Sequence, residues 1–409
     1  MGIIQRQGFK STFVSYVGVF IGAVSTLTIY SVEKEFYGLY QFLFSTASLL
    51  LPVIIFGGSS IAVRFHPKNQ KDDPAYRNLL SFLMMQVLLG ILFSALLLVV
   101  LGDRVYDMLI QKDDDPLVQK YLFVAFPMAC LMGLNAVLTA YISNYGRIVV
   151  PEIANRLWQK IALPILIVLV MVNVLNPDQY VVGMMAMLTV ATFILVIYLF
   201  RLDRPTLAFP SFLLNPVKRK AVFSFGLFAI LNEMGTQLAF NVDKVMIGTM
   251  VDLTNTGAYG ILTFMVNVML IPGGALYRIA TPIVARSLVE KDMERTGDIY
   301  SRTSLVLTVL GALILGPVLI NIDEIVSLLP RSQEFNGFFL IILFAGLAKW
   351  FELATSINTQ IIVYSNYYRF NLVALIALGV LNVVMNYWLI SKQGIVGAAL
   401  ATLLSLTLY

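Results

Sequence analysis

Apolar runs of about 20 residues recur along almost the whole chain, and this is the length that a helix needs to cross a membrane. Between polar breaks we find about twelve such runs. They begin near Thr12, Leu39, Leu79, Gln119, Val149 and Gln179 in the first half, and near Ala221, Gly257, Ile299, Phe335, Phe370 and Gly394 in the second. The pattern predicts an all-α polytopic membrane protein.

The charge content agrees with this prediction. Of 409 residues, 59% are hydrophobic and only 12% are charged, whereas roughly a quarter of the residues of a soluble domain are charged. One large soluble core is excluded, because soluble cores split into separate domains beyond roughly 300 residues.

Lysine and arginine predict the orientation, because they concentrate in loops on the cytoplasmic side. If the N-terminus is cytoplasmic, seventeen of the loop lysines and arginines lie inside. Five lie outside: Lys34, Arg104, Lys112, Arg331 and Lys392. This topology accounts for the net charge of +5, so nucleic acid is not an expected partner.

Short matches in the same order indicate an internal duplication. "SNYGR" at 143–147 returns as "SNYYR" at 365–369. Gly and Tyr of "FYGLY" match those of "NTGAY", and each of these spans carries a later proline, Pro52 or Pro272. "QYVVGMMAM" at 179–187 parallels "QGIVGAALA" at 393–401. We therefore predict two pseudo-symmetric six-helix lobes, 1–200 and 221–409, joined by a cytoplasmic linker at 201–220.

Six spans per half is an even number, so both halves enter the membrane from the same side. The repeats are then parallel, and transporters of this kind place the substrate path between their halves and rock one half against the other.

The fifth span contains a charged stripe in "VVPEIANRLWQKIALPI". Glu152, Arg156 and Lys160 are four residues apart and share a helical face, which Asn155 and Gln159 would widen. Lys160 lies roughly 20 Å along the helix from the loop before it, too deep for easy snorkelling. Two cations against one acid favour a patch for an anionic substrate. The structural alternative is that Glu152 neutralises Arg156 while Lys160 reaches another helix.

Other charged residues lie within the second-half spans. Lys349 and Glu352 are three residues apart, and cavity lining and mutual pairing fit them equally. Glu233 is a candidate proton or cation site, although a hydrogen-bonded neutral Glu fits as well. Arg278 lies near the inner end of its span, where it could snorkel or line the inner mouth of the substrate path.

Asp243 and Lys244 lie toward the outer end of their span, where we expect an interfacial ion pair. The lone Cys130 cannot form an internal disulfide, and His66 fits an interfacial position. One cysteine and one histidine cannot build a Cys/His metal cluster. The sequence contains no glycine-rich phosphate loop followed by Lys-Ser/Thr, which argues against transport powered directly by ATP hydrolysis. We expect a non-enzyme without a cofactor, with an H⁺ or Na⁺ gradient as the candidate energy source.

Several segments resemble one family. "MGIIQRQGFKSTFVSYVGVFIGAVSTLTIY", "FYGLYQFLFSTASLLLPVIIFGGSSIAVRF", "DKVMIG", "TGAYGI" and "GIVGAALAT" are similar to segments of Wzx-type polysaccharide-biosynthesis flippases of the bacterial inner membrane. The resemblance implies the fold of the multidrug/oligosaccharidyl-lipid/polysaccharide (MOP) exporters, two six-helix lobes in a V. It implies a polyprenyl-pyrophosphate oligosaccharide as substrate, of O-antigen, capsule or exopolysaccharide type. Further implied partners are membrane lipids and other polysaccharide assembly proteins.

On this reading Arg156 and Lys160 capture the pyrophosphate, with Lys349 and Arg278 as further cavity cations and Glu352 as a second candidate for ion coupling. The alternatives are a cation-coupled multidrug exporter or a lipid II flippase. A drug exporter should carry acids deep in the first lobe, and the first span has none. A membrane glycosyltransferase or polymerase would need a sizeable outer loop that carries catalytic residues. The sequence contains no such loop. The resemblance implies about fourteen spans, two more than we count, and the chain stops in the apolar run "GIVGAALATLLSLTLY", so we expect two further helices beyond it.

Overall fold

The computed structural model describes residues 3–66, 78–109, 115–202, 208–331, 338–365 and 367–408. These residues are overwhelmingly helical and contain no strand. Two compact units divide the chain, Met1–Met234 and Gly235–Tyr409, and their boundary falls inside the long helix α10 (Pro216–Met250). The loop residues Lys68, Lys71 and Arg77 and the linker residues 203–207 lie outside the described ranges.

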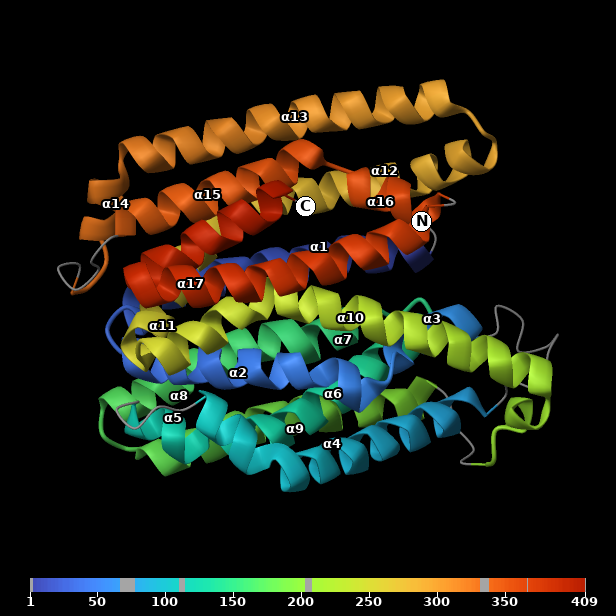
Figure 1. The fold of residues 1–409 in the computed structure, drawn as a ribbon, viewed down its shortest axis with the longest axis horizontal. Coiled ribbons are helices and arrows are strands. Elements are labelled where there is room, and N and C mark those ends of the chain that lie inside the picture. Colours follow the sequence, from blue (N-terminus) through green and yellow to red (C-terminus); the bar gives the residue numbers. More distant parts are fainter. Residues whose placement is uncertain are drawn as a thin grey trace. The chain divides into compact units, whose positions relative to one another are not determined.

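Helices α1 to α9 and the first half of α10 form the first unit (Figure 1). The shorter elements include two π-helical turns, η1, which ends the first span, and η4, which interrupts the fifth. The elements are α1 (Ile3–Ser25), η1 (Thr26–Tyr30), α2 (Lys34–Ile55), α3 (Gly58–Phe65), α4 (Leu79–Leu109), α5 (Pro116–Tyr121), η3 (Leu122–Val124), α6 (Ala125–Ser143), α7 (Val149–Glu152), η4 (Ile153–Leu157), α8 (Trp158–Met171), α9 (Pro177–Leu202) and η5 (Ser211–Leu214).

The second unit contains the rest of α10 and the helices that follow it. They are α11 (Leu253–Asn267), α12 (Leu270–Val289), α13 (Met293–Ile320), α14 (Ile322–Ser327), α15 (Phe338–Thr355), α16 (Asn358–Tyr364) and α17 (Tyr368–Leu408). The range of α17 contains two helices. Gly394 has φ 57° and ψ −137°, and the chain folds back there into a second helix (Figure 1).

The predicted spans coincide with these helices, and the all-α membrane fold is confirmed. Nine helices of the described part are long and apolar enough to cross a membrane, or ten if α11 and α12, bent by 54° at their break, form one span. One of the nine contains the fold-back at Gly394. The more polar α10 adds a further long helix of 35 residues.

Local structure repeats in the two units at the positions where the sequence repeats. The second span of each is broken near its proline, at Phe56–Gly57 between α2 and α3 and at Val268–Met269 between α11 and α12. The paired glycines Gly183 and Gly397 both allow close packing. A Cβ on Gly183 would lie 2.6 Å from Leu166, and a Cβ on Gly397 would lie 2.1 Å from the carbonyl oxygen of Leu389.

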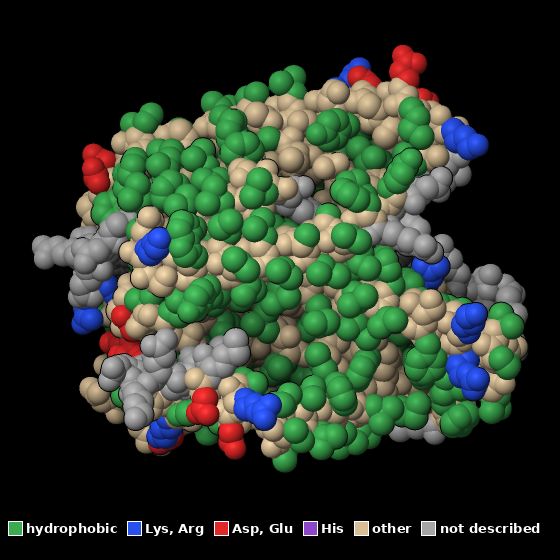
Figure 2. Space-filling view, viewed as in Figure 1, with side chains coloured by type: hydrophobic (Ala, Val, Ile, Leu, Met, Phe, Trp, Pro, Cys, Tyr) green, Lys and Arg blue, Asp and Glu red, His purple; other side chains and the backbone are tan. Residues whose placement is uncertain are grey.

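Exposed apolar side chains recur along the long helices, as contact with lipid requires. On α4 they include Leu88, Leu92, Leu96 and Val99. Figure 2 shows apolar side chains over most of one face, with Lys, Arg, Asp and Glu gathered at the helix ends.

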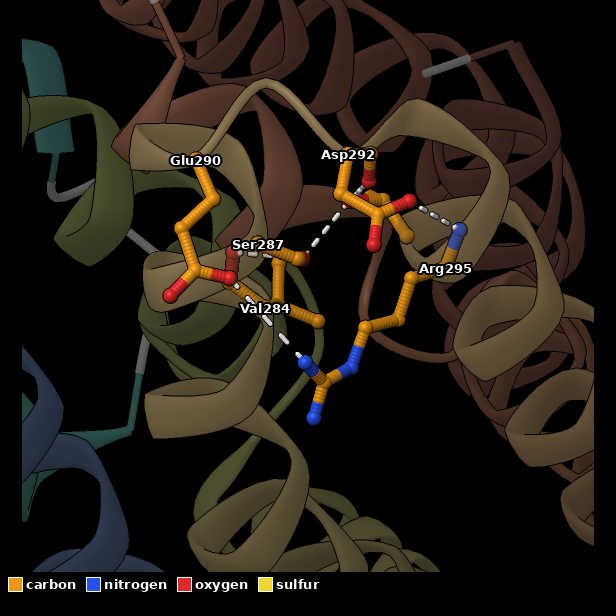
Figure 3. Close-up of polar contacts among 6 residues, drawn as sticks. Val284, Ser287, Glu290, Asp292 and Arg295 are labelled. Carbon is orange, nitrogen blue, oxygen red and sulfur yellow. Dashed lines mark hydrogen bonds and ion pairs between the residues drawn. The ribbon is translucent and has the colours of Figure 1, made fainter.

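A charged turn joins α12 to α13, where the sequence predicts a cytoplasmic loop (Figure 3). Asp292 caps α13 by accepting a hydrogen bond of 2.9 Å from the backbone N–H of Arg295. The Arg295 guanidinium lies 4.0 Å from the Glu290 carboxylate, and the hydroxyls of Ser287 and Thr296 are 2.7 Å apart beneath the turn. These contacts fix the start of α13 without burying an unpaired charge.

Candidate substrate site

The charged stripe predicted in the fifth span lies on α7, η4 and α8, and Arg156 is part of the π-helical turn η4. Single π-turns inside α-helices occur frequently at functional sites, because the wider turn changes the direction in which its side chains point.

Glu152, at the start of the stripe, is held by the first helix. Its carboxylate oxygens accept hydrogen bonds from the hydroxyls of Ser11 and Ser15 on α1, and its side chain is only 12% exposed. Hydrogen bonds to a charged group contribute roughly 1.5–3 kcal/mol each. The negative charge of Glu152 is therefore stabilised by neutral donors as well as by the nearby arginine.

Arg156 is oriented away from this buried contact. A guanidinium nitrogen lies 3.9 Å from the Glu152 carboxylate, and the Arg156 side chain is 76% exposed. An exposed ion pair at that distance contributes at most about 1 kcal/mol. A guanidinium has five N–H donors in a planar fork, and this weak pair engages few of them. Most of the N–H donors of Arg156 therefore remain available for a further partner.

Two side chains between these charges fix the rotation of the helix. Asn155 donates from Nδ2 to the hydroxyl of Thr139 on α6, at 2.7 Å, and Trp158 donates from Nε1 to the carbonyl of Met187 on α9, at 2.9 Å. The sequence predicts that Asn155 widens the polar face of this stripe, and in the structure its amide is directed to α6. It contributes instead by anchoring the helix that presents Arg156.

Lys160 is half-buried against the first helix. A Cβ on Gly18 would lie 3.4 Å from the Lys160 Cδ and 3.9 Å from its Nζ. The absence of a side chain at Gly18 leaves the groove in which the Lys160 stem lies. Together Ser11, Ser15 and Gly18 form a stripe of small residues on α1 that receives Glu152 and Lys160.

Lys349 and Glu352, on α15 of the second unit, pair with each other. The Lys349 Nζ lies 2.8 Å from the Glu352 carboxylate, with side-chain exposures of 15% and 35%. The same ammonium lies 5.4 Å from the centre of the Phe240 ring on α10. Of the two roles that fit this pair by sequence, the geometry favours mutual neutralisation.

The remaining predicted residues are less defined. Glu233 is half-buried on α10, next to the boundary between the units, and it takes part in an interaction. Arg278 belongs to α12, but its side chain lies outside the described part of the structure.

Asp243 differs from its prediction. No ion pair joins it to Lys244 among the described residues. Its carboxylate instead accepts a hydrogen bond from the Tyr259 hydroxyl, at 3.0 Å, and one from the backbone N–H of Lys244, at 2.8 Å. Asp243 is buried, only 9% exposed, and these two neutral donors stand in place of the predicted ion pair.

Sequence reasoning missed the part of the first helix in this site. The signal was present, since Ser11, Ser15 and Gly18 are spaced four and three apart on one helical face. It also missed η4, because no sequence pattern that we used distinguishes a π-turn from an α-turn.

Comparison with known proteins agrees with this architecture. The model of the family described as "Polysaccharide biosynthesis protein" matches residues 7–288. The chain therefore belongs to the polysaccharide biosynthesis protein family, and the resemblance to Wzx-type exporters is confirmed. No curated protein matches the sequence significantly.

Solved structures share the fold at low sequence identity. One is an inward-facing multidrug resistance MATE family transporter of the MOP superfamily, 13% identical with a TM-score of 0.71, covering 96% of this chain and 92% of that one. Another is the lipid II flippase MurJ in an inward closed conformation, 13% identical with a TM-score of 0.69, covering 97% and 85%. The outward-facing conformation of a MATE transporter matches at 12% identity and a TM-score of 0.57, covering 99% and 93%. The chain thus has a MOP transporter fold.

Proposed function

We propose that this protein translocates a polyprenyl-pyrophosphate-linked oligosaccharide from the cytoplasmic to the outer leaflet of the bacterial inner membrane, with its N-terminus in the cytoplasm. The family supports a transporter of polysaccharide biosynthesis. The charge distribution of the first unit supports an anionic group on the cargo.

One observation carries the proposal. Arg156 lies within a span and is 76% exposed, while the single nearby acid, Glu152, is held by two serines of α1. An arginine exposed to hydrocarbon is costly, so an intramembrane arginine faces a hydrated path or an anion. Lys160 lies one turn deeper on the same helix, and the two cations leave the stripe with net positive charge.

This pair suits a pyrophosphate. A guanidinium binds phosphate oxygens through two parallel hydrogen bonds, and an ammonium adds a compact charge beside it. A multidrug exporter that carries organic cations gains nothing from a net positive stripe, because like charges repel.

Alternating access is the transport mechanism that we propose. Both inward-facing and outward-facing conformations are known for transporters of this fold. In the inward-facing state, Arg156 and Lys160 would capture the pyrophosphate while the saccharide enters a hydrated cleft and the prenyl chain stays in lipid. Rocking of the two repeats would then present the head group outside.

The test is transport by the purified chain in liposomes that contain a fluorescently labelled polyprenyl-pyrophosphate oligosaccharide. The rate at which inner-leaflet head groups become accessible outside is measured for the wild type, for Arg156→Gln with Lys160→Gln, and for Arg302→Gln. Arg302 is a matched control, because it is 78% exposed and pairs with Asp298 four residues away. We expect transport by the wild type and the control and loss of transport in the double variant.

Other results would redirect the proposal. Full transport by the double variant at normal expression would leave a flippase but remove this site. Lack of transport by the wild type, together with efflux of an organic cation, would identify a drug exporter. Transport of lipid II in preference to the oligosaccharide carrier would identify a lipid II flippase.

A further inference from the structure

We propose that the start of α10 is a docking surface for anionic phospholipids. The surface consists of Arg219 and Lys220 together with the exposed apolar side chains of Val217, Phe223 and Leu227, and we call it the α10 surface. All five residues belong to the first unit. None of them belongs to the stripe that we assign to the cargo, so the inference does not depend on the proposed transport function.

Positive charge is concentrated here without compensation. From residue 208 to residue 232 the chain carries three consecutive basic residues, 218–220, and no acid. Arg219 and Lys220 are exposed, and neither forms an ion pair with another described residue. Arg295 and Arg302 on α13, by contrast, each pair with a nearby acid. The start of α10 therefore presents a net positive charge that an anionic partner can neutralise.

The helix itself disfavours these cations. Asn215 caps α10, because its Oδ1 accepts hydrogen bonds from the backbone N–H groups of Val217 and Lys218, at 3.0 and 3.2 Å. Arg219 and Lys220 therefore follow in the first turns, near the positive end of the helix dipole, where cations are disfavoured and anions are stabilised. Residues that break a local rule of this kind are expected at functional positions. A phosphate beside them would relieve the repulsion.

A contact with α4 places the cations at the edge of the apolar layer. The rings of Phe82 and Phe223 lie 6.3 Å apart, and Figure 1 shows that both helices start at the same end of the unit. Lys220 precedes Phe223 by three residues, as Leu79 precedes Phe82, so Lys220 lies level with the first residue of α4. The apolar span of α4 begins at that residue. The Lys220 ammonium is therefore at the depth of lipid headgroups.

Exposed apolar side chains around the cations favour a lipid as the partner. Phe223 and Leu227 are 58% and 62% exposed, and they lie three and seven residues after Lys220 on the same helical face. Before the cations, Leu214 and Val217 are 75% and 77% exposed. A soluble nucleotide or an acidic protein loop would leave these side chains in water. A phospholipid offers its phosphate to the cations and its acyl chains to the apolar groups.

Neighbouring elements hold this surface in place. Asn78, directly before α4, donates from Nδ2 to the carbonyl oxygen of Phe209 in the linker, at 3.2 Å. The exposed Arg64, at the end of α3, has its guanidinium carbon 4.4 Å from the centre of the Phe225 ring on α10. A guanidinium stacked on a ring keeps the N–H groups of its edges available for phosphate oxygens. Positive charge thus continues around the start of α10.

Lipid binding at this position would hold one end of a long helix. The 35 residues of α10 measure about 52 Å, which exceeds a hydrocarbon core of about 30 Å, so part of the helix lies outside that core. The boundary between the two units falls within α10. An anionic lipid at its start would fix that end of the joining helix at the membrane surface.

The test uses a fluorescent reporter at the surface itself. The full chain, with or without Phe223→Trp, is placed in phosphatidylcholine nanodiscs that contain rising fractions of brominated phosphatidylglycerol or brominated phosphatidylcholine. The measured signal is the quenching of the emission that Phe223→Trp adds, since bromine quenches an indole that it contacts. We expect at least about a tenfold preference for phosphatidylglycerol, and loss of this preference at high salt, because salt screens charges at a membrane surface.

Charge removal and charge exchange separate binding from folding. In the Phe223→Trp chain, Arg219→Gln with Lys220→Gln should abolish the preference, since each basic residue near an anionic surface contributes about fivefold in affinity. Arg219→Lys with Lys220→Arg keeps both charges and should retain it. Arg302→Gln is the control, because that side chain is 78% exposed and pairs with Asp298. Each variant is checked by size-exclusion chromatography.

Three results would overturn the proposal. The first is equal quenching by the two brominated lipids, or an unchanged preference after Arg219→Gln with Lys220→Gln. The second is displacement of phosphatidylglycerol by inorganic phosphate, which would show a site for soluble anions instead of a lipid surface. The third is a stronger preference for a polyprenyl-pyrophosphate lipid at equal mole fraction, which would make the α10 surface part of the cargo route. None of these results depends on whether the chain transports the cargo.

Discussion

Gly18 of α1 and Lys160 of α8 lie so close that a Cβ on the glycine would be 3.4 Å from the lysine Cδ. The first and fifth spans of the unit are therefore in contact where the fifth carries its deepest cation. A larger residue at 18 would compete with the Lys160 stem for the same space.

We predict that Gly18→Leu lowers lipid transport several-fold while leaving the protein folded, because it displaces Lys160. Gly18→Ala should have little effect, since its single Cβ meets Lys160 at van der Waals distance. Gly8→Leu on the same helix is the control, because no described residue lies within 4 Å of a Cβ there. The measurement is the initial rate of head-group translocation. Equal rates for Gly18→Leu and the wild type would show that the position of Lys160 is unimportant.

Glu152→Gln distinguishes a substrate site from a structural ladder. The amide can keep hydrogen bonds with Ser11 and Ser15 but cannot neutralise Arg156, which lies 3.9 Å away. We predict that transport is retained or rises in Glu152→Gln and falls at least about tenfold in Arg156→Gln, since a lost charge-assisted contact is worth more than about 1.4 kcal/mol. Transport rates at saturating and limiting lipid provide the comparison. Equal impairment of both variants would identify the pair as a scaffold.

The broad fold could be predicted because it depends on patterns that sequence carries directly. The length of the apolar runs predicts the spans. Sequence matches between the two halves, such as Gly183 with Gly397, predict the repeat. Both glycines prove to lie where adjacent helices pack closely. The breaks at Phe56–Gly57 and Val268–Met269 were signalled only by prolines four residues away.

The sites were harder to predict, because side-chain partners depend on packing between distant helices. Local spacing correctly places Glu152 and Arg156 on one face, but it cannot show that two serines more than a hundred residues earlier hold the carboxylate. Asp243 was assigned to the membrane interface by its place in the span. Its burial arises from α11, through Tyr259, which no spacing rule connects to it.

Lys349 and Glu352 test how a half-buried ion pair contributes to stability. With the two groups 2.8 Å apart and the lysine 15% exposed, Lys349→Met should destabilise the protein by about 1–3 kcal/mol, because it leaves Glu352 without its counter-charge. Lys349→Met combined with Glu352→Gln should recover part of that loss. Thermal unfolding of both variants measures the difference, and their transport rates are recorded in parallel. A double variant that is stable but inactive would contradict mutual neutralisation and return the pair to the substrate path.

Gly394 forms the fold-back of α17 with φ 57° and ψ −137°, a conformation that side chains with a Cβ rarely adopt. In the part of the chain that the structure describes, nothing lies within 4 Å of a Cβ at this position, so we expect the penalty for Gly394→Ala to come from the backbone. We expect Gly394→Ala to lower the free energy of unfolding by about 1–3 kcal/mol. Gly316→Ala, on α13 with equally open surroundings, should be neutral or stabilise by up to about 1 kcal/mol, because alanine favours the helix. Unchanged stability in Gly394→Ala would mean that the turn adopts another conformation in the membrane.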